Sequence, residues 1–223
     1  MNTSKFVTVT LLASFATLTS VILDCDETFN YWEPLHYLLY GDGLKPWEYS
    51  EKYALRPYAF LYLLYIPAKL LSILGLSKWS VFKLTKFIIS LVNIHALVQM
   101  CNVFGVDDMM IMTPGIISSS VAFLPNSIAC TMAAWSLTFW RQNQPNKLLL
   151  TLAAMTILTW PYAIVFYLPF VFTRFDGKQA RFAFQIRRYM LAGLFAVIYV
   201  AAPVTIIDYL QYGKVTLTWL NAV

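Results

Sequence analysis

Residues 6–27 read FVTVTLLASFATLTSVILDCDE and decide the fold class, because a long apolar run from Phe6 to Leu23 ends abruptly in acids. A helix needs roughly 20 predominantly apolar residues to cross a hydrocarbon core of about 30 Å. The run approaches that length, so we predict a first membrane-spanning helix here. A cleaved signal peptide is the alternative, since Lys5 precedes the run, but Leu23-Asp24-Cys25 lacks the small-residue pattern of a cleavage site.

Further apolar windows follow along the 223-residue chain. Hydrophobic residues make up 59% of the sequence and charged residues only 12%, which is more apolar than an ordinary soluble domain. Little of the chain remains for a soluble domain. We therefore predict an all-α integral membrane protein whose further spans lie within residues 58–76, 84–105, 109–140, 148–172 and 189–207.

The charge and cysteine content exclude several other classes. The net charge is +5, but the basic residues sit in short connections and not on one amphipathic face, so we expect a membrane lipid environment and no nucleic acid. The cysteines are odd in number and widely spaced. They therefore fit neither a paired zinc site nor a disulfide scaffold.

The distribution of Lys and Arg predicts the orientation, because short cytoplasmic loops carry the excess of positive charge. Residues 173–188 hold five basic residues against Asp176, and residues 77–86 hold three lysines and no acid, so both connections should be cytosolic. Residues 24–57 hold seven acids against Lys45, Lys52 and Arg56 and should face the other side. The span at 58–76 would then cross the membrane, and the acidic turn Asp107-Asp108 would share the side of residues 24–57.

Between Asp107-Asp108 and the basic connection at 173–188, the chain must then cross the membrane an odd number of times. We expect two crossings within residues 109–140, because Phe123-Leu124-Pro125-Asn126 interrupts the helical pattern, with Trp160-Pro161 as the rival break. The chain would cross about seven times, given spans of this length. Asp208 to Lys214 would emerge on the side of the acidic loop.

The acidic loop is expected to contain an interfacial helix over residues 26–40. Helical spacing divides its side chains into two faces, and Pro34 indicates that the regular helix begins at Glu33. Aromatic rings suit the headgroup layer, where one end of the ring is apolar and the other is wet. The acidic face would carry Asp26, Asn30, Glu33 and Tyr37, and the apolar face Tyr31, Leu35, Leu38 and Leu39.

Carboxylates beside aromatic rings at a membrane surface suit chemistry on sugars. One carboxylate can act as general base on an acceptor hydroxyl, a role worth about 10²–10⁴-fold in rate. The alternative is an acidic segment that only keeps the end of the first helix out of the bilayer. The residues alone leave both interpretations open.

The sequence of the whole loop resembles that of a known family. DCDETFNYWEPLHYLLYGDG at 24–43 and WEYSEKYALRPY at 47–58 are similar to the first luminal loop of the dolichyl-phosphate-mannose-dependent mannosyltransferases. These belong to glycosyltransferase family 22 of the GT-C superfamily. The resemblance is strongest to the α-1,2-mannosyltransferase branch that extends the lipid-linked N-glycan precursor. Later landmarks of that family resemble FLPNS at 123–127, TWPY at 159–162 and DYLQYGK at 208–214.

The resemblance implies a GT-C type multi-span helical bundle in the endoplasmic reticulum membrane, with residues 24–57 as a luminal catalytic loop. It implies dolichyl phosphate mannose as donor and a dolichyl-diphosphate oligosaccharide as acceptor. The new α-1,2 linkage would form with inversion. No cofactor and no metal are implied.

The resemblance also implies residue roles. Asp26 matches the catalytic base, with Glu27 as the second candidate beside it and Asp24 as a further acid of the motif. The implied lipid phosphate needs a nearby cation, and Arg56 is our candidate because a guanidinium binds phosphate oxygens with two N–H groups; the alternative is a positively charged anchor for the next helix, and Lys214 is a weaker candidate. We reject a metal-binding reading of Asp24-x-Asp26, since the implied donor carries a single phosphate. The remaining predicted substrate-binding residues are Asn30, Tyr31, Trp32 and Glu33.

The chain departs from the family in length. It ends at Val223, soon after the last landmark, whereas family members continue for a comparable length again. Residues 1–223 are therefore expected to be the N-terminal part of one GT-C transmembrane domain whose C-terminal half is absent. Two alternatives stay open: a mannosyltransferase acting on a glycosylphosphatidylinositol anchor, although that branch carries a histidine-proline pair where Asp24-Cys25 stands, and an inactive truncated membrane protein.

Overall fold

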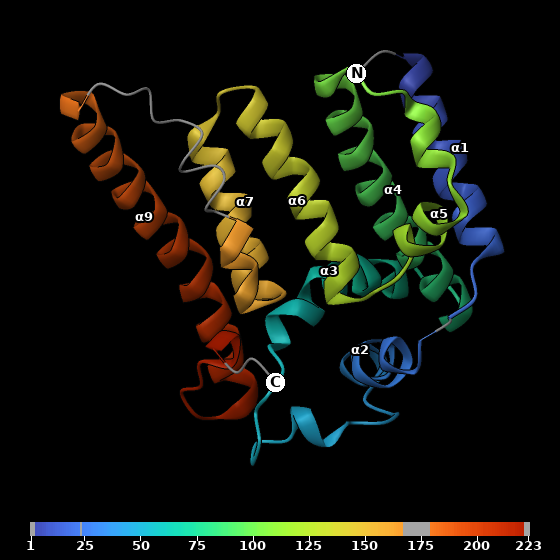
Figure 1. Cartoon of the computed structure of the whole chain (residues 1–223). Helices are drawn as coiled ribbons and strands as arrows, with labels where there is room; N and C mark the ends of the chain where they lie inside the picture. The colour runs from blue at the N-terminus through green and yellow to red at the C-terminus, as the bar shows by residue number, and fades with distance from the viewer. Residues whose placement is uncertain (1–2, 23, 167–178, 221–223) are drawn as a thin grey trace.

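A computed structural model describes residues 3–22, 24–166 and 179–220, which form helices and connecting turns and contain no strand (Figure 1). The prediction of an all-α protein is confirmed. Shorter helical turns lie at Glu27–Trp32, Trp47–Tyr49, Asp108–Met112, Pro161–Phe166 and Thr218–Leu220. The main helices are α1 (Thr3–Thr19), α2 (Glu33–Tyr40), α3 (Tyr58–Ile73), α4 (Lys78–Phe104), α5 (Pro114–Ser120), α6 (Pro125–Arg141), α7 (Pro145–Leu158) and α9 (Gln179–Tyr212).

Several helices have the length and apolar character that a bilayer requires. Lys78–Phe104 and Gly193–Tyr212 qualify as single spans among the described residues, and α5 with α6 forms a third candidate that bends by 107°. Val7–Thr19, Tyr58–Ile73 and Pro145–Leu158 are shorter apolar helices. The chain is thus a multi-span helical membrane protein, as predicted, and the number of crossings stays a prediction.

Helices α1 and α4 are antiparallel neighbours. Val9 and Ala13 in the middle of α1 pack against Ile94 and Val98 in the second half of α4. The Nζ atom of Lys83, near the start of α4, donates to the carbonyl oxygen at the end of α1, on Thr17 (3.2 Å). The chain therefore descends along α1 and returns along α4, as Figure 1 shows.

The start of α4 lies beside the acidic loop, which corrects the predicted orientation. Lys78 Nζ is 3.3 Å from a carboxylate oxygen of Asp42 in that loop. Residues 77–86 therefore do not lie opposite residues 24–57, and α3 stays at the loop end of the bundle (Figure 1). Charge counting failed because the lysines after Lys78 belong to α4 itself, where Lys86 is 1% exposed, and so do not form a solvated loop.

The acidic turn Asp107-Asp108 lies at the other end of α4, so its predicted place on the loop side is also wrong. With 27 residues, α4 spans about 40 Å at 1.5 Å per residue. The side chains of the basic connection at 173–188 fall outside the described part of the chain.

The predicted break near Phe123 is confirmed. Helix α5 ends at Ser120 and α6 begins at Pro125, where proline occupies the first helical turn and needs no N–H partner. Helix α5 has 7 residues and so extends only about 10 Å, which is too short for a crossing by itself. The rival break exists as well, because α7 ends at Leu158 and a new turn starts at Pro161.

The interfacial helix forms with the predicted faces. Asp26 and Tyr37 are exposed, whereas Tyr31 and Leu35 are buried. Helix α2 begins at Glu33, as predicted, and a π-helical turn precedes it. Because the ring of Pro34 crowds the preceding turn, the backbone widens there, and Glu33 donates to the carbonyl five residues back, on Thr28.

The end of α9 is fastened to the acidic loop. Tyr212 donates its hydroxyl to the carbonyl oxygen of Arg56 (2.6 Å), and Gln211 Nε2 donates to the hydroxyl of Tyr62 (3.0 Å). Asp208 is fully buried and accepts the backbone N–H of Tyr58. The prediction that these distant segments share one end of the bundle is confirmed.

Candidate active site at the loop end of the bundle

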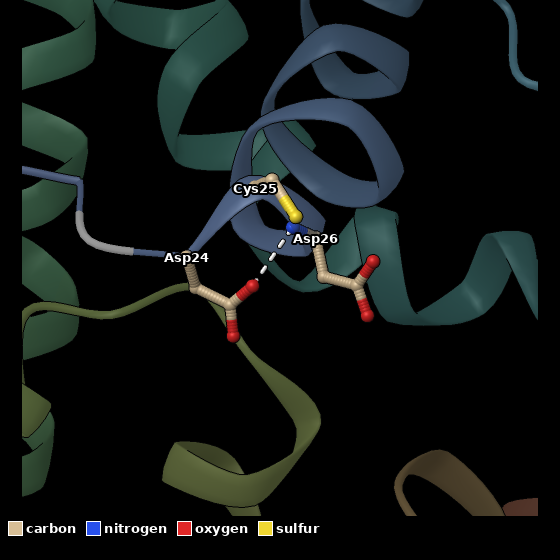
Figure 2. A group of neighbouring side chains, drawn as sticks. All are labelled: Asp24, Cys25 and Asp26. Carbon is tan, nitrogen blue, oxygen red and sulfur yellow. Dashed lines mark hydrogen bonds between the residues drawn. The ribbon is translucent and has the colours of Figure 1, made fainter.

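Asp24 and Asp26 have different surroundings. A carboxylate oxygen of Asp24 accepts the backbone N–H of Asp26 (2.8 Å), a local bond that starts the interfacial helix. The exposed Asp26 carboxylate accepts an N–H of the Asn30 side chain (3.1 Å), one helical turn further on. Figure 2 shows the two carboxylates directed to different sides. Asn30 therefore holds the Asp26 carboxylate in place, and Asp24 caps the backbone at the start of the helix.

The first three residues of the acidic loop lie close enough together to be considered as a metal site. One potential ligand atom from each of Asp24, Cys25 and Asp26 lies within 4.8 Å of the others, and all three residues are exposed. Hard cations such as Mg²⁺ prefer oxygen ligands, and Asp24 already accepts a backbone bond. The arrangement is explained by the start of the helix, and the absence of a metal requirement stays a prediction.

Glu27 lies inside the protein. It is 3% exposed, and its Oε1 accepts both the indole N–H of Trp32 (2.8 Å) and the backbone N–H of Phe123 (3.0 Å). The indole ring of Trp32 packs edge-on against Phe82 and Phe123. The charge of Lys86 also acts on Glu27 from α4. Glu27 and Trp32 thus join the loop to the start of α6, a packing role that the sequence did not predict.

Arg56 is held by two partners in the loop. Its Nε and Nη2 donate to the two carboxylate oxygens of Glu48 (2.9 and 3.3 Å), and its Nη1 donates to the hydroxyl of Tyr31 (2.6 Å). Burial acts to lower the pKa of Arg56, but the hydrogen bonds to Glu48 together with the charges of Glu48 and the nearby phenols outweigh it, and the pKa is raised. Burial raises the pKa of Tyr31 to about 12, so both groups keep their protons at neutral pH.

A cavity of about 180 Å³ opens beside this cluster. Its walls include residues of both loop segments, of FLPNS and of TWPY, whereas DYLQYGK supplies no lining residue. Asp26 is not among the lining residues, although its charge acts on the phenol of Tyr31, which is. The lining residues are Tyr31, Trp47, Glu48, Tyr49, Leu55, Arg56, Pro57, Phe60, Pro125, Ile157, Leu158, Thr159, Trp160, Pro161 and Thr218.

Two landmark segments are joined directly at this cavity. The indole N–H of Trp160 donates to the side-chain oxygen of Asn126 (2.7 Å). The ring of Trp160 also stacks on Tyr162, with ring centres 5.6 Å apart. The break before α6 and the break after α7 therefore come together and form one wall.

The other predicted residues lie away from the cavity lining. Glu33 accepts the backbone N–H of Leu44 (3.2 Å), and a Cβ on Gly43 (φ +121°) would lie 3.3 Å from the same Glu33 oxygen. Glu33 therefore shapes the turn after α2. Lys214 is exposed, and its Nζ reaches the carbonyl oxygen of Lys52 (3.4 Å).

Sequence reasoning missed four residues at this end of the bundle. Glu48 and Tyr49 belong to the quoted loop run, and Glu48 is the acid that Arg56 binds. Asp208 opens the DYLQYGK segment, where only Lys214 was considered. Thr218 follows that segment and donates its hydroxyl to Asp208. An acid and an arginine within one short loop was the available signal for Glu48.

The fold and the site define a helical membrane protein whose acidic, aromatic loop closes over a cavity at one end of the bundle. Residues 4–223 match the family model of the Alg9-like mannosyltransferases, and the chain belongs to this family. It is similar to the human protein named alpha-1,2-mannosyltransferase ALG9, with 36% identity over 219 residues that cover 93% of this chain and 35% of that protein.

Two further relatives are also named alpha-1,2-mannosyltransferases. The chain is 30% identical over 227 residues to the Arabidopsis thaliana alpha-1,2-mannosyltransferase ALG9, covering 97% of this chain and 39% of that protein. It is 31% identical over 223 residues to the Schizosaccharomyces pombe alpha-1,2-mannosyltransferase alg9, covering 91% of this chain and 37% of that protein. The chain thus spans little more than a third of the length of these relatives. No solved structure matches it.

Proposed function

We propose that the protein transfers mannose in α-1,2 linkage from dolichyl phosphate mannose to the lipid-linked oligosaccharide precursor of N-glycosylation. The observation that carries the proposal is the cavity, which is lined by residues from both loop segments, from FLPNS and from TWPY. Membership of the Alg9-like family and the names of the relatives support the reaction. The site would face the lumen of the endoplasmic reticulum.

The reaction is a single displacement at the anomeric carbon. Asp26 takes the proton from an acceptor hydroxyl as its oxygen forms the new bond, and the bond to the phosphate oxygen breaks. The phosphate leaves with the electron pair. One displacement inverts the anomeric carbon, so one base suffices. Asp26 suits this role better than Glu27, because Glu27 is buried and already accepts two hydrogen bonds.

The leaving phosphate needs a fixed positive charge. Arg56 lines the cavity and keeps its charge at any pH in the cell. A guanidinium binds phosphate oxygens through two N–H groups and supplies charge without a metal. The proposed reaction is therefore metal-independent.

The cavity walls suit a hexose. The lining includes the aromatic residues Trp47, Tyr49 and Trp160, together with Thr159 and Thr218. Side chains with an apolar body and a polar tip can contact both the ring carbons and the hydroxyls of a sugar. We propose that the transferred mannosyl group occupies this cavity with its phosphate at Arg56.

Profiling the lipid-linked oligosaccharides in cells that lack the gene tests the function. We expect N-glycan precursors that lack α-1,2-linked mannose to accumulate, and the gene to restore the full precursor. Normal N-glycan precursors beside accumulated anchor glycolipids would instead support the glycosylphosphatidylinositol alternative. The purified 223-residue chain belongs in the same assay, since its turnover would exclude an inactive fragment.

A further inference from the structure

Arg56 is held along one edge of its guanidinium group. The group has five N–H donors in a planar fork. Glu48 takes Nε–H and one N–H of Nη2, and Tyr31 takes one N–H of Nη1. Among the contacts of the described residues, one N–H on each terminal nitrogen is therefore left over. Two N–H groups on neighbouring nitrogens match two oxygens of a phosphate.

The residues that hold Arg56 are themselves fixed. Tyr31 is 3% exposed and its ring packs edge-on against Phe60. Glu48 belongs to the turn Trp47–Tyr49, in which buried Tyr49 donates its hydroxyl to the backbone carbonyl of Asn30 (2.9 Å). The backbone of Arg56 accepts the hydroxyl of Tyr212. Arg56 is therefore held both at its backbone and at its guanidinium group before any ligand arrives.

We propose that Glu48 is a positioning residue that aims Arg56, so that its two remaining N–H groups receive the phosphate of the lipid donor. The proposal rests on the proposed function, because that function supplies the phosphate. Glu48 touches no reacting atom. Glu48 occupies the Nε edge of Arg56, and together with Tyr31 it leaves one N–H on each terminal nitrogen for the phosphate, which then binds without displacing Glu48.

If Glu48 competes with the donor for Arg56, the predicted effect of its removal on donor affinity is the opposite. If Glu48 occupied the phosphate position, its removal would free Arg56 and tighten donor binding. If Glu48 aims Arg56, its removal leaves the side chain with several orientations and weakens donor binding. The effect would fall on the KM for the donor more than on kcat, because the contact to phosphate is made before transfer.

The test measures transfer kinetics for Glu48→Gln in the protein expressed from its own gene. We expect the KM for dolichyl phosphate mannose to rise about tenfold, with kcat within about threefold of wild type, as for the loss of a ground-state contact. Glu51→Gln is the matched control, because it removes an exposed acid of the same loop that does not line the cavity, and we expect wild-type constants.

Glu48→Asp keeps the carboxylate on a shorter side chain and should give a KM between those of the wild type and Glu48→Gln. If Glu48→Gln does not reach the membrane, the donor KM of Glu48→Asp decides the test instead. An unchanged or lower donor KM in the variant that folds would overturn the proposal. A wild-type protein that transfers no mannose would overturn the proposed function instead. Binding of dolichyl phosphate alone, weakened by Glu48→Gln, would still support the positioning role.

Discussion

Asp208 on α9 accepts the backbone N–H of Tyr58, the first residue of α3 and 150 positions earlier in the chain, at 2.8 Å. Its second carboxylate oxygen accepts the hydroxyl of Thr218. The first N–H groups of a helix have no partner within the helix, and an acid there also meets the positive end of the helix dipole. One buried carboxylate thus joins the C-terminal segment to the loop that carries Arg56.

Asp208→Ala should destabilise the protein by about 1–3 kcal/mol, because buried N–H groups at the start of α3 lose their acceptor. Thermal unfolding of the detergent-solubilised protein measures this. Asp107→Ala is the matched control, since Asp107 also accepts a nearby backbone N–H (2.9 Å) but lies exposed. Equal losses for the two variants would show that Asp208 does no more than an exposed cap.

The ion pair between Lys78 and Asp42 places the start of α4 on the side of the acidic loop. Single cysteines in a cysteine-free background test this with a reagent that does not cross membranes. Lys78→Cys and Glu51→Cys should react from the same side, and Asp107→Cys from the opposite side. Labelling of Glu51→Cys together with Asp107→Cys, with Lys78→Cys reacting only from the other side, would return α3 to the predicted role of a crossing helix.

Glu27 and Lys86 are buried groups of opposite charge, and the charge of Glu27 acts on Lys86. Glu27→Gln should destabilise the protein, because a buried lysine loses the nearby negative charge. Adding Lys86→Met should recover part of that loss. The folded double variant should keep at least about a tenth of wild-type transfer, since the account gives the base role to another acid. A loss of several hundredfold in transfer would instead make Glu27 the base.

The raised pKa of Tyr31 predicts that the protein loses stability at alkaline pH. Burial raises its pKa from 10.0 to about 12, so folding favours the protonated phenol. Its contribution is complete below pH 10 and declines as the pH rises toward 12, by about 2–3 kcal/mol in total at 1.36 kcal/mol per pKa unit. Unfolding midpoints measured between pH 9 and 12 should fall less steeply for Tyr31→Phe than for the wild type. Parallel curves for the two proteins would contradict the assignment.

Much of the loop was predictable because local rules govern it. The spacing of Asp26, Tyr31 and Leu35 determines which side chains face the interior, and Pro34 determines where α2 begins. The break before Pro125 follows from the same property of proline. The contact between the acidic loop and the end of α9 was also predictable, because it required only that both segments lie at one end of the bundle.

The orientation of α3 and the partners of the charged residues were not predictable in this way. Charge counting treats Lys78 and Lys86 as loop charges, whereas their neighbours in space are Asp42 and Glu27. Those pairs form between segments far apart in the sequence. The division of labour between Asp26 and Glu27 has the same origin, since the backbone of Phe123 is what holds Glu27 inside.

The proposed base of mannosyl transfer is Asp26, and its replacement tests the account most directly. The measurement is the initial rate of mannose transfer from dolichyl phosphate mannose to the lipid-linked oligosaccharide by Asp26→Asn, beside Glu51→Gln. The account predicts at least about a 100-fold fall for Asp26→Asn, with normal membrane insertion and donor KM, and a near wild-type rate for the control. A rate for Asp26→Asn within about threefold of the wild type would contradict it.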